Sequence, residues 1–259
     1  MGPEGMALHN CVLVYLPRRH SHGDVGAVVR DMVKHPQYVE LVETLNWNFE
    51  GEPPSQYITF PEIEGAWAKR ENVDPTPCYH HDVHLVEREL AHNLRVCPLP
   101  IPLKIAVMCY ESIGRVNAFY ANQNVYNENA PALFYGTITM MGKRTPIHPA
   151  MTRYLVSHEY GHGVQYALER AIGLKADNIE PWYKEQFRPT ATSKYGPGNW
   201  HTNTGELIAN DYRILVAQKE TEFWPHEGYA RPENIPHLVA FWKNVVQIFE
   251  RLNENLYPL

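Results

Sequence analysis

Apolar residues fall into short runs in the first half of the chain and into a wider, helix-like spacing in the second half. A short apolar run closed by Pro, Gly or polar turn residues is typical of a β-strand. On this pattern we predict strands at about residues 10–16, 57–60, 103–110, 116–120 and 133–139. The Asn-rich segment between the last two strands, residues 121–130, is predicted to be a connection.

Helical spacing recurs in several longer segments. Apolar side chains three or four positions apart lie on one face of a helix, which predicts helices at about residues 25–45, 84–94, 149–172, 204–219 and 236–253. Gly173 stands where a glycine commonly ends a helix. Residues 47–78 are rich in Pro, Gly and Glu and are predicted to form a linker or an extended wrap. Because the strands come mostly before the helices, the order predicts an α+β fold.

Composition excludes several classes of protein. The chain has 259 residues, of which 44% are apolar, so it can bury a core and is not expected to be disordered. Acidic residues outnumber basic ones by 29 to 23, which argues against nucleic-acid binding through phosphate contacts. The chain contains no run of 18 apolar residues and no visible signal peptide, so we expect no membrane partner and a cytoplasmic location.

Candidate chemistry lies in the predicted helix at residues 149–172, which contains an HExxH motif at residues 158–162. Residues four apart on a helix lie about 40° apart around the axis, so His158 and His162 can face one ion. Two imidazole nitrogens supply half of a tetrahedral zinc shell. Glu159 points further round the helix, where it can accept a proton from a metal-bound water. The alternative is an amphipathic helix whose histidines are merely packed or solvated.

Two glycines, Gly161 and Gly163, flank the second histidine of this motif. Each weakens a helix by about 1 kcal/mol relative to alanine. Their presence is explained if another backbone has to approach the helix closely at this point.

A zinc site of this kind needs a third protein ligand. The extended motif HExxHxxGxxH is excluded, because the two positions that would complete it are occupied by Gln165 and Leu168. A carboxylate from a later helix is the other common solution, and Glu206, in the first turn of a predicted helix, is the residue we predict. The alternative role for Glu206 is in a capping box, with Asn203 as the N-cap.

Two other carboxylates compete with Glu206 for the ligand role. Glu180 and Glu185 lie closer in sequence to His162. Glu180 precedes Pro181, which biases it away from the helical conformation. We therefore rank both residues below Glu206.

The HExxH motif followed by Glu206 in the pattern E-x-x-A-x-D-Y-R resembles the gluzincin group of zinc metallopeptidases, which includes the thermolysin-like enzymes. The resemblance implies a zincin-like fold, with a mixed β-sheet packed on the HExxH helix and a helical C-terminal part. It also implies Zn²⁺ as cofactor, His158, His162 and Glu206 as its ligands, and Glu159 as catalytic base. The resemblance covers roughly residues 103–219.

A second resemblance lies upstream of the motif. The segment Asn117-Ala118-Phe119-Tyr120 is similar to the N-A-[FY]-[WY] edge strand that runs beside the substrate in thermolysin-like peptidases. Addition of a strand to an exposed sheet edge suits peptide substrates, because backbone hydrogen bonds form with any sequence. We therefore predict that Asn117, Ala118 and Phe119 bind substrate, the alternative being an ordinary strand end.

The chain departs from the thermolysin-like pattern in two respects. The interval of 44 positions between His162 and Glu206 is longer, which requires an insertion. The family has an aspartate four residues after the ligand glutamate, whereas this chain has Asn210. Asp211 is one position later, and we predict that it orients a ligand histidine as an outer-shell residue.

Together these features predict a zinc-dependent peptidase. Residues 79–259 would form the zincin-like catalytic domain and residues 1–78 an N-terminal β/α segment of unknown role, unless the chain is one continuous domain. The predicted reaction is attack of zinc-bound water on a peptide or protein substrate, assisted by Glu159. Stabilisation of the oxyanion needs a further donor, and the sequence does not choose among Tyr195, His201, Tyr212, His226 and Tyr229.

Two other functions use the same residues. Two histidines and one carboxylate also form the facial triad of non-haem iron oxygenases, although that chemistry does not call for a glutamate between the histidines. The third reading is a protein without catalytic activity, in which the metal is structural and the acidic, aromatic-rich C-terminal part binds a partner.

Overall fold

The structure is a computed structural model that describes residues 11–17, 55–60, 73–77, 79–101, 103–107, 110–112, 117–127, 130–171, 179–192, 198–217 and 223–254. The predicted helix at residues 25–45, Gly173 and Tyr195 lie outside these residues. Contacts divide the chain into two compact units. Unit 1 comprises residues 1–88, 101–155 and 256–259, and unit 2 comprises residues 89–100 and 156–255. The predicted break after residue 78 falls inside unit 1, and a separate role for residues 1–78 stays a prediction.

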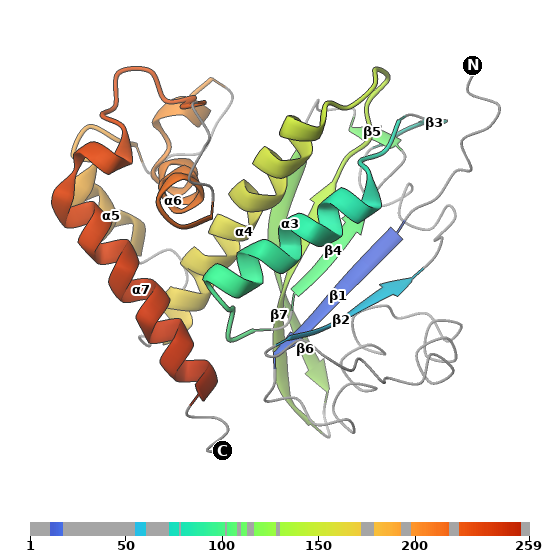
Figure 1. The fold of residues 1–259 in the computed structure, drawn as a ribbon, viewed down its shortest axis with the longest axis horizontal. Helices are drawn as coiled ribbons and strands as arrows, with labels where there is room; N and C mark the ends of the chain where they lie inside the picture. The colour runs from blue at the N-terminus through green and yellow to red at the C-terminus, as the bar shows by residue number, and fades with distance from the viewer. Residues whose placement is uncertain are drawn as a thin grey trace. The chain divides into compact units, whose positions relative to one another are not determined.

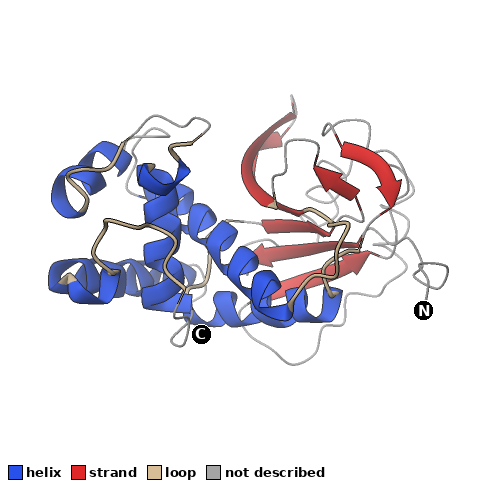
Figure 2. Cartoon of the chain, turned by 90° about the horizontal axis from the view of Figure 1, so that it is seen from above, coloured by secondary structure: helices blue, strands red, loops and turns tan. Residues whose placement is uncertain are grey.

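All of the described strands belong to unit 1 and are drawn in red in Figure 2. They are β1 (Cys11–Pro17), β2 (Ser55–Phe60), β3 (Val73–Pro77), β4 (Leu103–Val107), β5 (Tyr110–Ser112), β6 (Ala118–Asn127) and β7 (Ala130–Met140). Five of them form one sheet in the order β2-β1-β4-β7-β6, and β3 pairs with β5 (Figure 1). β4 and β7 are parallel and the other neighbours in the five-stranded sheet are antiparallel, so this sheet is mixed.

The predicted connection at residues 121–130 is wrong. β6 continues to Asn127 and β7 begins at Ala130, so most of this segment is paired strand. Asn122 lies opposite Gly136 and Asn124 opposite Phe134 in the antiparallel ladder. Asparagine has a low strand propensity, but cross-strand pairing along a long hairpin overrides that preference.

The described helices are α3 (Val83–Val96), α4 (Pro149–Ala171), α5 (Ile179–Phe187), α6 (Thr204–Tyr212) and α7 (Pro236–Glu254). α3 and α4 begin in unit 1 and continue in unit 2, whereas α5, α6 and α7 lie wholly in unit 2. α6 is followed by a π-helical turn, Arg213–Ala217, so the predicted helix at residues 204–219 is shorter than expected. Apart from α3, the described strands precede the described helices along the chain, and the predicted α+β class is confirmed at that level.

The sequence explains why α3 forms where it does. Asp82 caps the helix, since its Oδ1 accepts hydrogen bonds from the N–H groups of His84 at 2.9 Å and Leu85 at 3.2 Å. The apolar side chains predicted to share one face are all buried, namely Leu85, Val86, Leu90 and Leu94.

Within the part of the chain that the structure describes, no helix has both the length and the apolar character needed to cross a membrane.

Helix α5 was not expected from the sequence. Its first turn contains Glu180 and Pro181, so the inference that Pro181 keeps Glu180 out of a helix is wrong. Proline is tolerated in a first turn, where its missing N–H has no partner to lose. At the start of α5, the N–H of Ile179 donates a hydrogen bond to Oε1 of Glu169 at 3.3 Å.

Candidate metal centre

Three side chains that the sequence predicts to be metal ligands meet within unit 2. His158 and His162 extend from α4, and Glu206 extends from α6. Glu206 Oε2 lies 3.0 Å from His158 Nε2 and 3.7 Å from His162 Nε2. One ligand atom from each of the three residues falls within 4.8 Å of the other two. The paired imidazoles and the later carboxylate therefore converge on one point.

The two separations from Glu206 lie close to those found around a tetrahedral metal ion. Zinc binds nitrogen and oxygen ligands at about 2.0–2.2 Å, so two ligand atoms of one tetrahedron are about 3.3–3.6 Å apart. The distances of 3.0 and 3.7 Å fall on either side of that range. Two histidines and one carboxylate are a donor set used by catalytic zinc, with the fourth position open. The residues present therefore fit a metal ion.

The backbone of Glu206 is anchored by the cap of its own helix. Its N–H donates to Oδ1 of Asn203, the N-cap, at 3.2 Å. The N–H of Asn203 donates to the carbonyl of Trp200 rather than to the Glu206 carboxylate, so the reciprocal half of a capping box does not form. The cap and the ligand position, treated as alternatives from the sequence, are thus compatible: Asn203 holds the backbone while the carboxylate meets the histidines.

Gly161 allows α4 and α6 to approach closely. A Cβ atom at this position would lie 2.7 Å from the carbonyl oxygen and 2.9 Å from the Cα of Ala209. Both of these atoms belong to the backbone of α6 and cannot turn aside as a side chain can. The expectation that another backbone approaches this part of the HExxH helix is confirmed at Gly161.

Replacing Gly161 by alanine should therefore separate the two helices that carry the ligands. Overpacking costs about 1–3 kcal/mol, against about 1 kcal/mol gained in helix propensity. We expect the midpoint of urea denaturation to fall, and metal affinity to fall with it, because Glu206 moves away from the histidines. Unchanged stability and affinity in Gly161→Ala would show that this close approach is not needed.

A buried chain of hydrogen bonds ties α3 to both ligand helices. Asn93 Nδ2 donates to Ser157 Oγ at 2.9 Å, and Tyr212 Oη donates to Asn93 Oδ1 at 3.0 Å. Ser157 Oγ donates in turn to Glu89 Oε1 at 2.8 Å. Ser157 precedes His158 on α4 and Tyr212 ends α6, so Asn93 joins the two elements that carry the ligands. Removing one partner from such a chain leaves a buried polar group unsatisfied, at a cost of about 1–3 kcal/mol.

The ligands affect each other's protonation. Burial lowers the pKa of His162, but contact with Glu206 and the negative charges of Glu206, Glu159 and Glu180 outweigh it and raise this pKa to about 9. Burial raises the pKa of Glu206, but its contacts with His158 and His162 hold that pKa far below its usual range. In the metal-free protein near neutral pH, His162 therefore carries a proton that a metal ion has to displace.

Glu159 lies on α4 beside the first histidine and is 5% exposed. One residue along a helix turns the side chain about 100° around the axis, away from the face shared by His158 and His162. Its negative charge contributes to the raised pKa of His162, which places its carboxylate within electrostatic reach of the ligand group. A carboxylate in this position can accept a proton from water at the metal.

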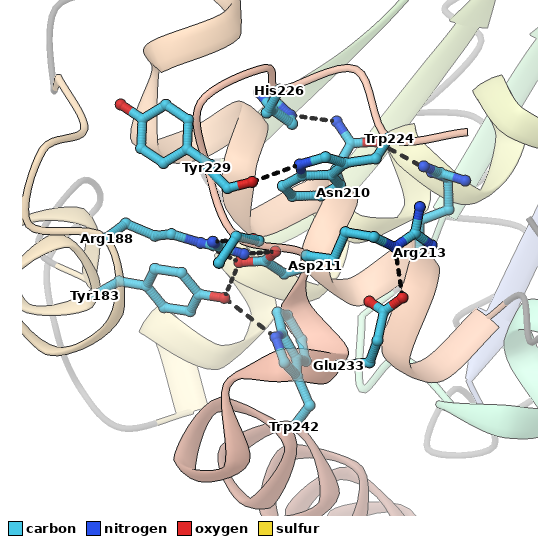
Figure 3. A network of polar contacts seen from close by, with 12 residues as sticks. Tyr183, Arg188, Asn210, Asp211, Arg213, Trp224, His226, Tyr229, Glu233 and Trp242 are labelled. Atoms are coloured by element: carbon cyan, nitrogen blue, oxygen red, sulfur yellow. Dashed lines mark hydrogen bonds and ion pairs between the residues drawn. The ribbon is translucent and has the colours of Figure 1, made fainter. Parts of the chain in front are cut away.

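Asp211 does not have the predicted role of orienting a ligand histidine. Its Oδ1 accepts a hydrogen bond from Arg188 at 2.5 Å, and its Oδ2 accepts one from Tyr183 Oη at 2.7 Å (Figure 3). The reason is helical geometry, because five positions along α6 turn the Asp211 side chain about 140° away from Glu206. Asp211 instead joins α6 to Tyr183 of α5 and to Arg188, the residue directly after α5.

Asn210 links α6 to the surroundings of the candidate metal centre. Its Nδ2 donates to the carbonyl of Glu206 at 3.1 Å and to Nε2 of His226 at 2.9 Å, and its Oδ1 accepts from Nε of Arg213 at 3.0 Å (Figure 3). An aspartate here would place an oxygen against the carbonyl of Glu206, so that two acceptors would face each other. Asparagine suits this position because its amide nitrogen donates to both acceptors.

The predicted oxyanion donors differ in how deeply they are buried. Tyr212 and His226 are fully buried, and each is engaged in the hydrogen bonds of the surrounding helices and loops. His201 is exposed and Tyr229 is half-buried, so these two stay candidates. Tyr195 lies outside the described residues.

The remaining predicted residues do not join the ligand group. Asn117, Ala118 and Phe119 belong to unit 1, where β6 is the end strand of the described sheet, and their role in binding substrate stays a prediction. Glu185 is exposed on α5. Oε1 of Glu180, in the first turn of α5, accepts a hydrogen bond from Gln165 at 3.3 Å. The carboxylate that meets both histidines is that of Glu206.

Trp200 is a neighbour of the site that the sequence did not indicate. Its ring centroid lies 6.0 Å from that of His158 and 5.2 Å from that of His226. It comes from a short 3₁₀ turn, Trp200–Thr202, in a stretch without apolar periodicity. No spacing rule relates a residue of such a loop to a distant helix, so the sequence does not indicate that Trp200 lies near His158.

This arrangement can bind one divalent ion and holds a carboxylate on the adjoining helical position. A metal with an open position and a neighbouring base can assist hydrolysis. No protein-family model, curated protein or solved structure matches this chain, so its function has to be inferred from the chemistry of these side chains.

Proposed function

We propose that the protein is a zinc-dependent metallopeptidase. The observation that carries the proposal is the convergence of His158 and His162 of α4 with Glu206 of α6, at separations close to those of tetrahedral zinc, beside Glu159 of α4. In an HExxH motif the two histidines bind the metal and the glutamate between them serves as the general base. A metal site that only binds the ion does not need this glutamate. The same helix thus supplies two ligands and the group that moves the proton.

The reaction proposed is hydrolysis of a peptide bond. Zinc held by His158, His162 and Glu206 would supply a polarised carbonyl and a water whose pKa is lowered to about 7. Glu159 takes the proton from the attacking water and delivers it to the departing amine nitrogen, so the carboxylate is regenerated at the end of the cycle. His201 and Tyr229 are the described side chains proposed as donors to the developing oxyanion.

The choice of a peptide as substrate rests on β6 and on the resemblance of the sequence to the gluzincin metallopeptidases. β6 ends the five-stranded sheet, and its first residues, Ala118 and Phe119, pair with β7 on one side. A substrate strand added on the other side would form backbone hydrogen bonds of the kind that many peptide-binding proteins use. The proposal includes the zincin-like fold that the resemblance implies.

The experiment that tests the proposal combines metal analysis with a peptide library. We expect one zinc ion per chain, cleavage of library peptides, loss of cleavage on chelation, and its return on addition of zinc. Stoichiometric iron with oxygen-dependent turnover would replace this proposal by an oxygenase built on the same facial triad. Bound zinc without cleavage of any peptide would favour a metal-binding protein that has no catalytic role.

Metal affinity should increase with pH. Because the pKa of His162 is raised to about 9 in the metal-free protein, binding at lower pH releases one proton. The apparent affinity should therefore rise about tenfold per pH unit between pH 6 and 8 and level off near pH 9. Calorimetric titration in two buffers of different ionisation enthalpy measures the proton released. Affinity that does not vary between pH 6 and 8 would contradict the coupling between His162 and Glu206.

A further inference from the structure

Beyond the three ligands, the structure contains a closed circuit of contacts around them. The circuit runs from Glu206 to Asn210, from Asn210 to His226, from His226 to Trp200, and from Trp200 to His158, which meets Glu206 again. We propose that Trp200 and His226 are positioning residues that fix the orientation of the His158 imidazole for metal binding. This inference rests on the proposed metal site and adds two residues to it.

The orientation of His226 is determined by its hydrogen bonds. Its Nδ1 faces the carbonyl of His201 at 2.7 Å, and a carbonyl only accepts, so Nδ1 carries the proton and donates. Its Nε2 faces Nδ2 of Asn210 at 2.9 Å, and an amide nitrogen only donates, so Nε2 accepts. The oxygen of Asn210 is assigned by Arg213, whose Nε donates to it at 3.0 Å. His226 therefore occupies one tautomer and one ring orientation.

The ring held in this way forms a platform for Trp200. The two rings are stacked, with centroids 5.2 Å apart and planes inclined by 14°. Trp224 contacts His226 as well, at a centroid distance of 4.9 Å. Because His226 is fully buried and both of its nitrogens are bonded, Trp200 stacks on a ring that is held in one orientation.

Trp200 in turn limits the freedom of His158. The Trp200 and His158 rings are 6.0 Å apart and inclined by 43°, and the ring of His162 meets His158 edge-on at 4.9 Å. The His158 ring therefore has three neighbours: the ring of Trp200, the ring of His162 and the carboxylate of Glu206. Outer-shell residues that orient a metal-binding histidine typically change metal affinity 10- to 100-fold when replaced.

The test uses Co²⁺ as the probe, because its visible absorption depends on coordination number and ligand orientation. We expect Trp200→Ala to weaken Co²⁺ binding about 10- to 100-fold and to alter the absorption spectrum. Trp200→Phe keeps an aromatic ring and should restore most of the affinity. His226→Gln can keep both hydrogen bonds, to Asn210 and to the His201 carbonyl, but offers no ring, so it should resemble Trp200→Ala while retaining its folded circular dichroism.

Trp182→Ala is the matched control. It removes another tryptophan of unit 2, one that is 43% exposed and packs on Phe187 and Phe241, and it should leave Co²⁺ binding unchanged. Wild-type affinity and spectrum in folded His226→Gln and in Trp200→Ala would overturn the inference and leave the proposed function standing. If Trp200→Ala does not fold, His226→Gln decides alone. Absence of Co²⁺ binding by the wild-type protein would overturn the metal site and, with it, the positioning roles.

Discussion

Substitution of Glu159 by glutamine should reduce peptide hydrolysis about 10²- to 10⁴-fold while leaving zinc bound at full stoichiometry. Glutamine has nearly the same shape as glutamate but cannot accept the proton of the attacking water. The ligand set of His158, His162 and Glu206 is untouched by the change, so metal binding should persist. The measurements are kcat/KM on a peptide identified from the library and zinc content after dialysis.

Glu185→Gln is the control for this prediction, because Glu185 also lies in unit 2 but is exposed on α5. It should change neither kcat/KM nor zinc content. Undiminished hydrolysis in Glu159→Gln would refute the assignment of Glu159 as the base. Loss of zinc together with activity would instead show that Glu159 supports the metal centre rather than the proton transfer.

Substitution of Arg188 by methionine should destabilise the protein by about 3–5 kcal/mol near neutral pH. Arg188 contacts Asp211 through two nitrogens, at 3.2 Å and 2.5 Å (Figure 3). It donates a third hydrogen bond to the carbonyl of Ala230 at 2.7 Å. The side chains of the pair are 2% and 0% exposed. Without the guanidinium, the buried carboxylate keeps only the hydrogen bond from Tyr183. Urea denaturation of the two proteins measures the difference.

The size of this loss should depend on pH. Burial raises the pKa of Asp211 to about 6, although Arg188 and Tyr183 act to lower it. A folded-state pKa above the unfolded value favours the native state at low pH, and that contribution is lost as pH rises through the folded-state pKa. Removing Arg188 raises the pKa further, so the loss of stability should be larger at pH 8 than at pH 5. Equal losses at the two pH values would indicate that Arg188 contributes through packing alone.

Two further variants separate charge from packing at Arg188. Asp211→Asn combined with Arg188→Met removes both charges and should recover part of the stability, because no unpaired ion is left in the interior. Arg231→Met removes an arginine from a half-exposed pair with Glu233 and should cost less than about 1 kcal/mol. A double variant as unstable as Arg188→Met would contradict the unpaired-charge explanation.

Much of the secondary structure was predictable where one element provides its own pattern. The stripe of Leu85, Val86, Leu90 and Leu94 indicated α3, and each of these side chains is buried. Prediction failed where context overrides local preference. The asparagines of β6 are held in a hairpin by β7, and Pro181 fits the first turn of α5. Both cases depend on a neighbour or a position that composition does not reveal.

For the candidate site, the sequence by itself determined the two histidines and the glutamate between them. Their relation follows from the rise and turn of a single helix, and it holds wherever that helix is placed. It also offered Glu206 as a third ligand, but with Glu180 and Glu185 as competitors, since nothing local relates a carboxylate to a helix 44 positions away.

Only the tertiary structure decided which carboxylate meets the histidines and which residues surround them. The approach of α6 to α4 at Gly161, the turn of Asp211 toward Arg188, and the stack of Trp200 on His226 each join segments distant in sequence. These contacts arise from packing, in which many weak interactions between remote elements set each separation to within a fraction of an ångström. Helical periodicity can be recognised in the sequence, whereas the distance between two helices is fixed only when the molecule folds.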